Sequence, residues 1–213
     1  MFGPRLRVVM DEFGVTLVPI EKKDMDAVIP LFSSLVVHQY TQRYAGVVTE
    51  DEHEWWEKMR TDKQQIVWGI KPDGGEVIVG ITGIHDIDIF GGCATGIIIA
   101  DTKWHGKGVA TRAHLMRTIY TADYLARLTI RSDVYVPNEA SRRALERVGY
   151  MVTGKELRRG FGKGAYRDSY VLSWLHPEKI GVLYPEGLPE EYKEGVDRAR
   201  IALEKARGLV ELL

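Results

Sequence analysis

A glycine-rich turn, Trp104-His105-Gly106-Lys107-Gly108, joins the apolar segment 96–100 to a helical pattern over 109–120. A strand that leads through glycines into a helix brings free backbone N–H groups to the positive end of the helix dipole, where phosphate binds. Glycine also lets the backbone approach a ligand closely. The spacing differs from the nucleotide loop Gly-x-x-x-x-Gly-Lys-Ser/Thr, and Thr111 replaces the third glycine of a dinucleotide-binding turn. The turn predicts a phosphate site, with an ordinary turn as the alternative.

A second unit lies downstream. Residues 128–134 alternate between apolar and polar side chains, which is typical of a strand. Asn138 is a good N-cap for the next helix, and Gly149 is a natural C-terminal stop. Taken alone, this segment is explained as a well-capped surface helix.

In this order, the two units resemble the GNAT superfamily of acyl-CoA-dependent N-acetyltransferases. The family pattern Gln/Arg-x-x-Gly-x-Gly/Ala corresponds to residues 105–110, with His105 in place of Gln or Arg. The family's second signature, an Asn opening a helix that ends in Gly-Phe or Gly-Tyr, corresponds to Asn138 and Gly149-Tyr150. The segments 17–21 and 165–174 are similar to the RimJ/RimL branch, and the resemblance spans residues 15–175.

The resemblance implies an α/β fold (an α+β mixed sheet) in which helices flank a central twisted sheet, and it implies acetyl-CoA as acyl donor. The amides of 106–110 would hold the pyrophosphate, while the backbone at 98–100 would hold pantetheine and polarise the thioester carbonyl. Lys107 would either pair with a phosphate or face solvent. The expected acetyl-CoA-binding residues are Ile98, Ile99, Ala100, His105, Gly106, Lys107, Gly108, Val109, Ala110, Thr111, Asn138 and Ser141.

The implied reaction is direct attack of a neutral primary amine on the thioester, which expels a thiolate. Many family members carry a Tyr seven residues after the helix-opening Asn, but this position is Leu145 here. Ser141 is the nearest substitute, either as a hydrogen-bond donor to the sulfur or as a helix cap only. A base is also needed, and His85 fits because histidine exchanges protons near neutral pH, unless it is a structural residue. The candidate catalytic residues are Ser141, Asn138, His85 and, as a phenol near pKa 10, Tyr166, with Tyr170 as a further backup.

In this family the first two helices and their loop form a wall of the acceptor groove. We therefore expect His38, Tyr40, Tyr44 and Asp86 to bind the acceptor, together with Gln39 and the acidic turn at 50–54. A protein N-terminal α-amine is the leading acceptor. The alternatives are a polyamine, an aminoglycoside, or no reaction at all in a protein that senses acyl-CoA.

Charge and cysteine content limit the partners. The net charge is −1, which disfavours bulk attraction to nucleic acid or to an anionic membrane. The exception is segment 155–167, with five positive charges against one negative; it is either a solvated hairpin or a contact for an acidic partner such as ribosomal RNA. The single cysteine, Cys93, and the absence of a signal peptide predict a cytoplasmic protein. No apolar run is long enough to span a membrane, and the scattered histidines predict no metal site.

The remaining pattern predicts the order of elements. Strands are expected at 15–20, 66–70, 77–84 and 94–100 and around residues 157 and 171, and helices at 23–37 and from a Thr49/Glu52 capping box. We divide the chain into an acetyltransferase domain (1–176), a linker (177–189) and a helix (190–213). The helix carries an apolar stripe at heptad spacing: Tyr192, Val196, Ala199, Leu203, Ala206, Val210 and Leu213. This stripe either packs onto its own domain or pairs with a second subunit, and we expect a homodimer.

Overall fold

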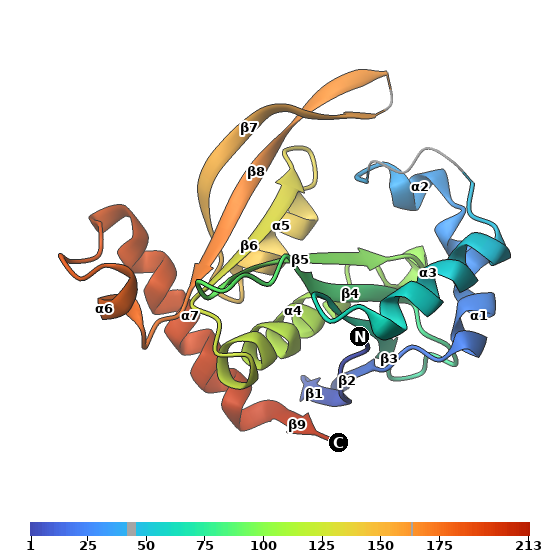
Figure 1. Ribbon diagram of the computed structural model, residues 1–213, viewed down its shortest axis with the longest axis horizontal. Helices are drawn as coiled ribbons and strands as arrows, with labels where there is room; N and C mark the ends of the chain where they lie inside the picture. Colours follow the sequence, from blue (N-terminus) through green and yellow to red (C-terminus); the bar gives the residue numbers. More distant parts are fainter. Residues whose placement is uncertain (42–45, 163) are drawn as a thin grey trace.

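The computed structural model describes residues 1–41, 46–162 and 164–213. Its centre is a nine-stranded sheet in the order β7-β8-β6-β5-β4-β3-β2-β1-β9 (Figure 1). All neighbouring strands are antiparallel except β5 and β6. The strands are β1 (Leu6–Met10), β2 (Phe13–Val18), β3 (Ile66–Pro72), β4 (Gly80–His85), β5 (Gly92–Ile99), β6 (Thr129–Tyr135), β7 (Met151–Gly162), β8 (Ala165–Leu175) and β9 (Val210–Leu212). The predicted mixed sheet is confirmed.

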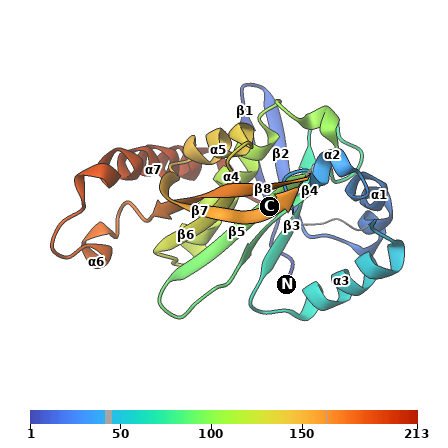
Figure 2. The same cartoon turned by 90° about the horizontal axis from the view of Figure 1, so that it is seen from above.

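Helices cover both faces of this sheet (Figure 2). They are α1 (Lys22–Phe32), α2 (Leu35–His38), α3 (Thr49–Thr61), α4 (Val109–Ile119), α5 (Glu139–Glu146), α6 (Ile180–Leu183) and α7 (Glu190–Leu209), with a 3₁₀ turn at Thr102–Trp104 and a π turn at Tyr120–Tyr124. One apolar core joins α4 and α7 to the sheet around Trp68 and Trp174, and a second joins α1 and α3 to the other face around Met25 and Phe32. Within the described residues, no helix is long and apolar enough to cross a membrane.

The first helical region differs from its prediction. The expected helix at 23–37 is broken, because α1 ends at Phe32 and α2 begins at Leu35. The Ser33 N–H still makes the helical bond to the Ile29 carbonyl at 3.2 Å, but Ser34 has an extended backbone (ψ 120°) and becomes the N-cap of α2. The expected Thr49/Glu52 capping box is also wrong: the N-cap of α3 is Val48, without a side-chain cap bond. A capping box is present instead at the start of α1.

The C-terminal helix ends earlier than expected. Helix α7 stops at Leu209, and residues Val210–Leu212 form β9, which pairs antiparallel with β1. The sequence pattern did not predict β1, which forms a hairpin with β2. The turn between them, Asp11-Glu12, has positive φ at both residues, a conformation that usually requires Asn-Gly or Asp-Gly. The hairpin therefore lacked its usual sequence signal.

The apolar stripe of α7 is used within the chain. Val196, Ala199, Leu203 and Ala206 are buried, and α7 contacts α4, β8 and β1. The helix packs so closely that a Cβ on Gly149 would lie 2.3 Å from the Cα of Ala199. Of the two interpretations of the stripe, packing onto its own domain is the one observed. The homodimer stays a prediction, and it would need another surface.

Strands β5 and β6 separate after a short parallel pairing. They pair only through Gly92–Ala94 and Thr129–Arg131, although β5 continues to Ile99 and β6 to Tyr135. Each keeps its antiparallel partner along its outer edge, β4 for β5 and β8 for β6. The sheet therefore opens as a V between the second halves of β5 and β6, close to the glycine-rich turn.

Candidate active site

The glycine-rich turn has the backbone that its sequence predicts. Gly106 and Gly108 adopt left-handed φ values of 76° and 75°, and Gly108 is the N-cap of α4. A Cβ on Gly106 would meet nothing within 4 Å, so the backbone there faces open space. The first amide groups of α4 have no intrahelical acceptor. Together these features suit a bound pyrophosphate.

His105, which replaces the family's Gln or Arg, has a structural task. Its Nε2 lies 2.9 Å from the carbonyl oxygen of Ile99, at the last residue of β5. The bond ties the turn to the end of the strand. On the other side of the turn, the buried Arg112 donates through Nε to the Phe13 carbonyl at 3.1 Å and through Nη1 to the Gly108 carbonyl at 3.3 Å. The turn is therefore held from both ends.

The open edge of β5 carries backbone groups that do not face β4. Ala100 donates to the carbonyl of Val79 at 2.8 Å, in line with the β4–β5 ladder. Residues alternate in direction along an antiparallel strand, so Ile98 and Gly96 also face β4. The N–H groups of Ile97 and Ile99 consequently point into the V between β5 and β6. An acyl carbonyl placed in the V would meet one of these donors.

A buried arginine lies behind this edge. Arg117 of α4 is fully buried, and its Nη1 donates to the Gly96 carbonyl at 2.9 Å and to the Thr82 hydroxyl at 2.6 Å. Its Nη2 donates to His114 Nδ1 at 2.9 Å, and burial holds the pKa of that imidazole well below its usual value. The peptide group whose oxygen Arg117 binds is the one whose N–H, on Ile97, points into the V. The sequence pattern gave no sign of this role for Arg117, because a basic residue on an amphipathic helix normally faces solvent.

Two cavities meet at the open edge of β5. The larger, here called the loop cavity, has a volume of about 590 Å³ and lies among the glycine-rich turn, α5 and residues 36–41. The smaller, here called the helix cavity, has a volume of about 360 Å³ and lies beneath α1 and α3. Thr41, Ile97 and Ile98 line both. The two cavities are therefore neighbours beside the V.

Most residues predicted to bind acetyl-CoA line the loop cavity. They are Ile98, Ile99, His105, Gly106, Gly108, Val109, Ala110, Thr111, Asn138 and Ser141. Ala100 does not line it and is buried in the α1–α3 core. Lys107 does not line it either, and its ammonium lies 5.0 Å from the centre of the Trp104 ring. Asn138 caps α5 by accepting from the Ser141 amide at 3.3 Å, and Leu145 is a buried core residue.

The predicted acceptor and catalytic residues are more dispersed. His85 and His38 line the helix cavity, and Tyr40 lines the loop cavity. His85 Nδ1 contacts Asp86 Oδ2 at 3.0 Å, whereas His38 is buried with both ring nitrogens bonded within the protein. Tyr166 lies outside both cavities, on the β7–β8 hairpin against Phe161. Tyr44 falls outside the described residues.

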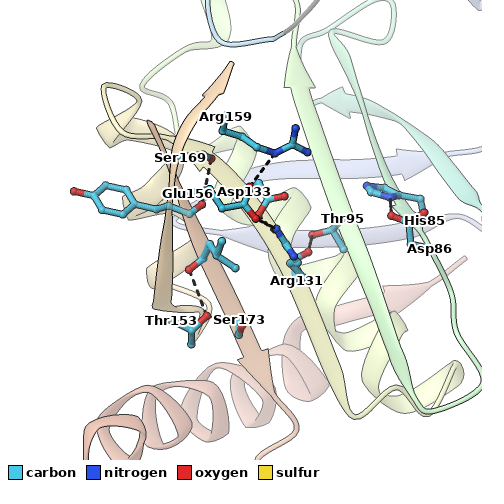
Figure 3. Close-up of polar contacts among 12 residues, drawn as sticks. His85, Asp86, Thr95, Arg131, Asp133, Thr153, Glu156, Arg159, Ser169 and Ser173 are labelled. Carbon is cyan, nitrogen blue, oxygen red and sulfur yellow. Dashed lines mark hydrogen bonds and ion pairs between the residues drawn. The ribbon is translucent and has the colours of Figure 1, made fainter. Parts of the chain in front are cut away.

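An ion-pair cluster that the sequence pattern did not predict lies on β6 (Figure 3). Arg131 binds Asp133 at 3.1 Å and Glu156 of β7 at 2.7 Å, and Arg159 binds Glu156 at 2.9 Å. Hydrogen bonds to the two carboxylates raise the pKa of Arg131 above its ordinary value. The His85–Asp86 pair lies across β5 from this cluster (Figure 3). The charges of the basic segment are thus partly compensated, and its contact with an acidic partner stays a prediction.

Known proteins share this architecture. The family profile described as "Acetyltransferase (GNAT) domain" matches residues 15–151. The structure is similar to a spermidine N-acetyltransferase from Vibrio cholerae solved with CoA and spermine, with a TM-score of 0.69 and 21% identity over 76% of this chain and 95% of that one. It is also similar to a GNAT-family acetyltransferase from Bacillus anthracis, with a TM-score of 0.66 and 20% identity over 79% of this chain and 98% of that one.

A further similar structure is a putative phosphinothricin N-acetyltransferase, with a TM-score of 0.62 and 19% identity over 76% of this chain and 98% of that one. No curated protein matches the sequence. At these identities the solved structures establish the fold, while the family profile covers well over half of the chain. The strand–turn–helix unit, the V beside it and the profile lead to one conclusion: the chain belongs to the GNAT acetyltransferase family and is an N-acetyltransferase.

Proposed function

We propose that the protein transfers an acetyl group from acetyl-CoA to a protein N-terminal α-amine, as a member of the RimJ/RimL-like branch. The two cavities that meet at Thr41, Ile97 and Ile98 support a direct transfer, because donor and acceptor can enter from different sides. Burial raises the pKa of the only cysteine, Cys93, to about 12, which disfavours an acetyl-cysteine route.

Acetyl-CoA supplies the activated acyl group, and the loop cavity has the features to bind it. The amides around Gly106 and Gly108 and at the start of α4 face the pyrophosphate. The N–H group of Ile97 binds the thioester oxygen and stabilises the negative charge that develops on it, while the N–H group of Ile99, about 6.6 Å further along the strand, binds the pantetheine arm. One fixed donor of this kind contributes about 3–4 kcal/mol to catalysis. Arg117 positions the strand and polarises the Gly96–Ile97 peptide group from behind.

In the reaction the amine nitrogen bonds to the acetyl carbon, and the bond from that carbon to sulfur breaks. His85, oriented by Asp86, takes the proton that the amine loses. The Ser141 hydroxyl donates a hydrogen bond to the departing sulfur, which becomes the thiol of CoA once protonated. The products are an amide and CoA.

The acceptor is proposed from the charge of the helix cavity. Among the described residues that line it, none is acidic, and the undescribed segment 42–45 (Gln-Arg-Tyr-Ala) contains no carboxylate either. A polyamine carries several positive charges that need carboxylate partners. An α-amine carries one charge and has a pKa near 8, so an appreciable fraction is neutral at pH 7. This absence of carboxylates is the observation that carries the proposal of an α-amine.

Thiol release from acetyl-CoA tests the proposal with three acceptors: short peptides with free N-termini, spermidine and an aminoglycoside. Release with peptides is the expected result. Thiol release only with spermidine or with the aminoglycoside would show that the acceptor is a small amine and not a peptide α-amine. Acetyl-CoA binding without release to any acceptor would instead favour an acyl-CoA sensor.

A matched pair of histidine variants tests the base. His85→Gln should lower kcat at pH 7 by about a hundredfold or more, and the loss should shrink near pH 9, where the α-amine is neutral without help. His53→Gln is the control, because His53 also lies 2.9 Å from a carboxylate, that of Asp26, but lines neither cavity. Equal effects of the two substitutions would remove His85 from the mechanism.

A further inference from the structure

The helix cavity is lined mainly by apolar side chains from both of its walls. They include Phe32, Trp55, Met59, Val67, Ile81 and Ile98. Phe32, Trp55 and Met59 come from α1 and α3, and the other three come from β3, β4 and β5. The cavity thus lies between the helical layer and the sheet, in the position of a small apolar binding pocket.

Apart from His85 at its edge, the polar side chains that line the helix cavity are already bonded within the protein. Both ring nitrogens of His38 have partners, Thr41 and the Phe32 carbonyl. Gln65 Nε2 donates to Asp62 at 2.8 Å, and the Thr82 hydroxyl donates to the Gly96 carbonyl at 2.9 Å. A polar or charged substituent inside the cavity would lose its hydration and gain few partners, which is unfavourable. The cavity therefore selects an apolar group.

Two glycines give the cavity its depth. Gly83 and Gly96 are direct partners across β4 and β5 and both line the cavity. Gly96 lies on the same face of β5 as Ile98, because side chains two residues apart share a face. A Cβ on Gly96 would meet nothing within 4 Å. The floor of the cavity is thus bare backbone, next to the Ile97 and Ile98 positions where the two cavities join.

We infer that the acceptor is a primary amine whose adjacent carbon carries a bulky apolar side chain, such as the α-amine of a peptide beginning with Leu, Met or Phe. The side chain fills the helix cavity, and the amine then lies at the junction lined by Thr41, Ile97 and Ile98, with His85 at the edge of the same cavity. The inference rests on the proposed acetyl transfer to an α-amine. Each buried methylene should raise kcat/KM about fourfold.

A peptide series that varies only the first residue tests this inference on the full chain. Peptides beginning with Leu, Met or Phe should exceed the Ala peptide in kcat/KM by about tenfold or more, and the Gly peptide should be poorest. Leucinamide and phenethylamine distinguish a peptide acceptor from a small apolar amine. Activity on both compounds means that the cavity recognises the apolar group and needs no peptide backbone. A flat series, or a preference for Gly or Ala, overturns the inference.

The outcomes also separate this inference from the proposed function. Acetylation of peptides without regard to the first side chain keeps the proposed function and overturns the inference. Acetylation of spermidine in preference to every peptide overturns both. Binding of acetyl-CoA without thiol release to any acceptor also overturns both.

Substitutions in the cavity floor test the location. Gly96→Val should lower the Leu-to-Ala preference at least tenfold, because its side chain occupies the floor. Gly154→Val is the control: Gly154 is also a strand glycine with room for a Cβ, 3.8 Å from Val171, and it lines neither cavity. If Gly96→Val does not fold, Trp55→Ala is the second variant. It enlarges the cavity from the helix side and should raise kcat/KM for the Phe peptide relative to the Leu peptide. An unchanged preference in the folded variants overturns the inference.

Discussion

Gly106→Ala tests the phosphate-binding role of the glycine-rich turn, and the chain offers a close control. Gly106 and Gly74 have φ values of 76° and 74°, and a Cβ on either would meet nothing within 4 Å. The left-handed conformation costs a non-glycine residue about 1–2 kcal/mol. The two substitutions therefore have the same intrinsic cost, while only Gly106 lies in the loop cavity.

The expected results differ in where that cost is observed. Gly74→Ala should lower Tm by about 2–8 °C, at about 2–4 °C per kcal/mol for a chain of this size, and leave the KM for acetyl-CoA unchanged. In Gly106→Ala the turn can leave the left-handed conformation while no ligand is bound. Returning to that conformation when acetyl-CoA binds then costs the same ~1–2 kcal/mol. The KM for acetyl-CoA should then rise about five- to thirtyfold.

Thermal unfolding and initial rates of thiol release at saturating acceptor give the two quantities. The cost of the left-handed conformation appears either in Tm or in KM. If Gly106→Ala lowers Tm less than Gly74→Ala does, the KM for acetyl-CoA of Gly106→Ala should rise correspondingly more. A KM for Gly106→Ala within twofold of the unsubstituted protein would refute the reasoning, as would an equal increase in Gly74→Ala. In either case the turn would not bind the ligand through a left-handed backbone.

Three further predictions concern the sulfur, the buried histidine and the C-terminal helix. Ser141→Ala should lower kcat about tenfold, as expected for a hydrogen bond to a developing charge, with little change in acetyl-CoA affinity; unchanged turnover excludes Ser141. Burial lowers the folded-state pKa of His114, so below about pH 6.5 the unfolded chain binds a proton that the folded chain does not. The free energy of unfolding should therefore decrease from pH 7 to pH 5.5, and it should decrease less in His114→Gln. Denaturant titrations at several pH values measure this, and an equal pH dependence in the two proteins would contradict it. Gly149→Ala, whose Cβ would lie 2.3 Å from the Ala199 Cα at φ 93°, should cost about 3 kcal/mol or more. Gly187→Ala, with φ 112° and open surroundings, should cost about 1–2 kcal/mol; equal decreases in Tm would show that α7 does not pack as described.

The break between α1 and α2 shows where sequence patterns mislead. The apolar spacing continues through Ser33, yet α1 ends at Phe32 and Ser34 is extended, while the Ser33 hydroxyl lies 3.3 Å from two carbonyls, those of Ile29 and Val47. The second partner lies fourteen residues away, so no local pattern could include it. Likewise, β9 forms only because Val210–Leu212 meets β1, about two hundred residues earlier in the chain.

The sequence by itself determined the units whose interactions are local. The glycine turn at 105–108, the Asn138 cap and the alternation of the sheet strands depend on backbone conformation and on contacts a few residues apart, and the structure has all three. Tertiary structure alone decided which groups face one another. The contact of Arg117 with Gly96, the helix cavity, whose described lining residues include no acidic side chain, and the burial of the α7 stripe join segments far apart in the chain. Such contacts depend on how complete elements pack in three dimensions, and a one-dimensional pattern of residue types does not contain that information.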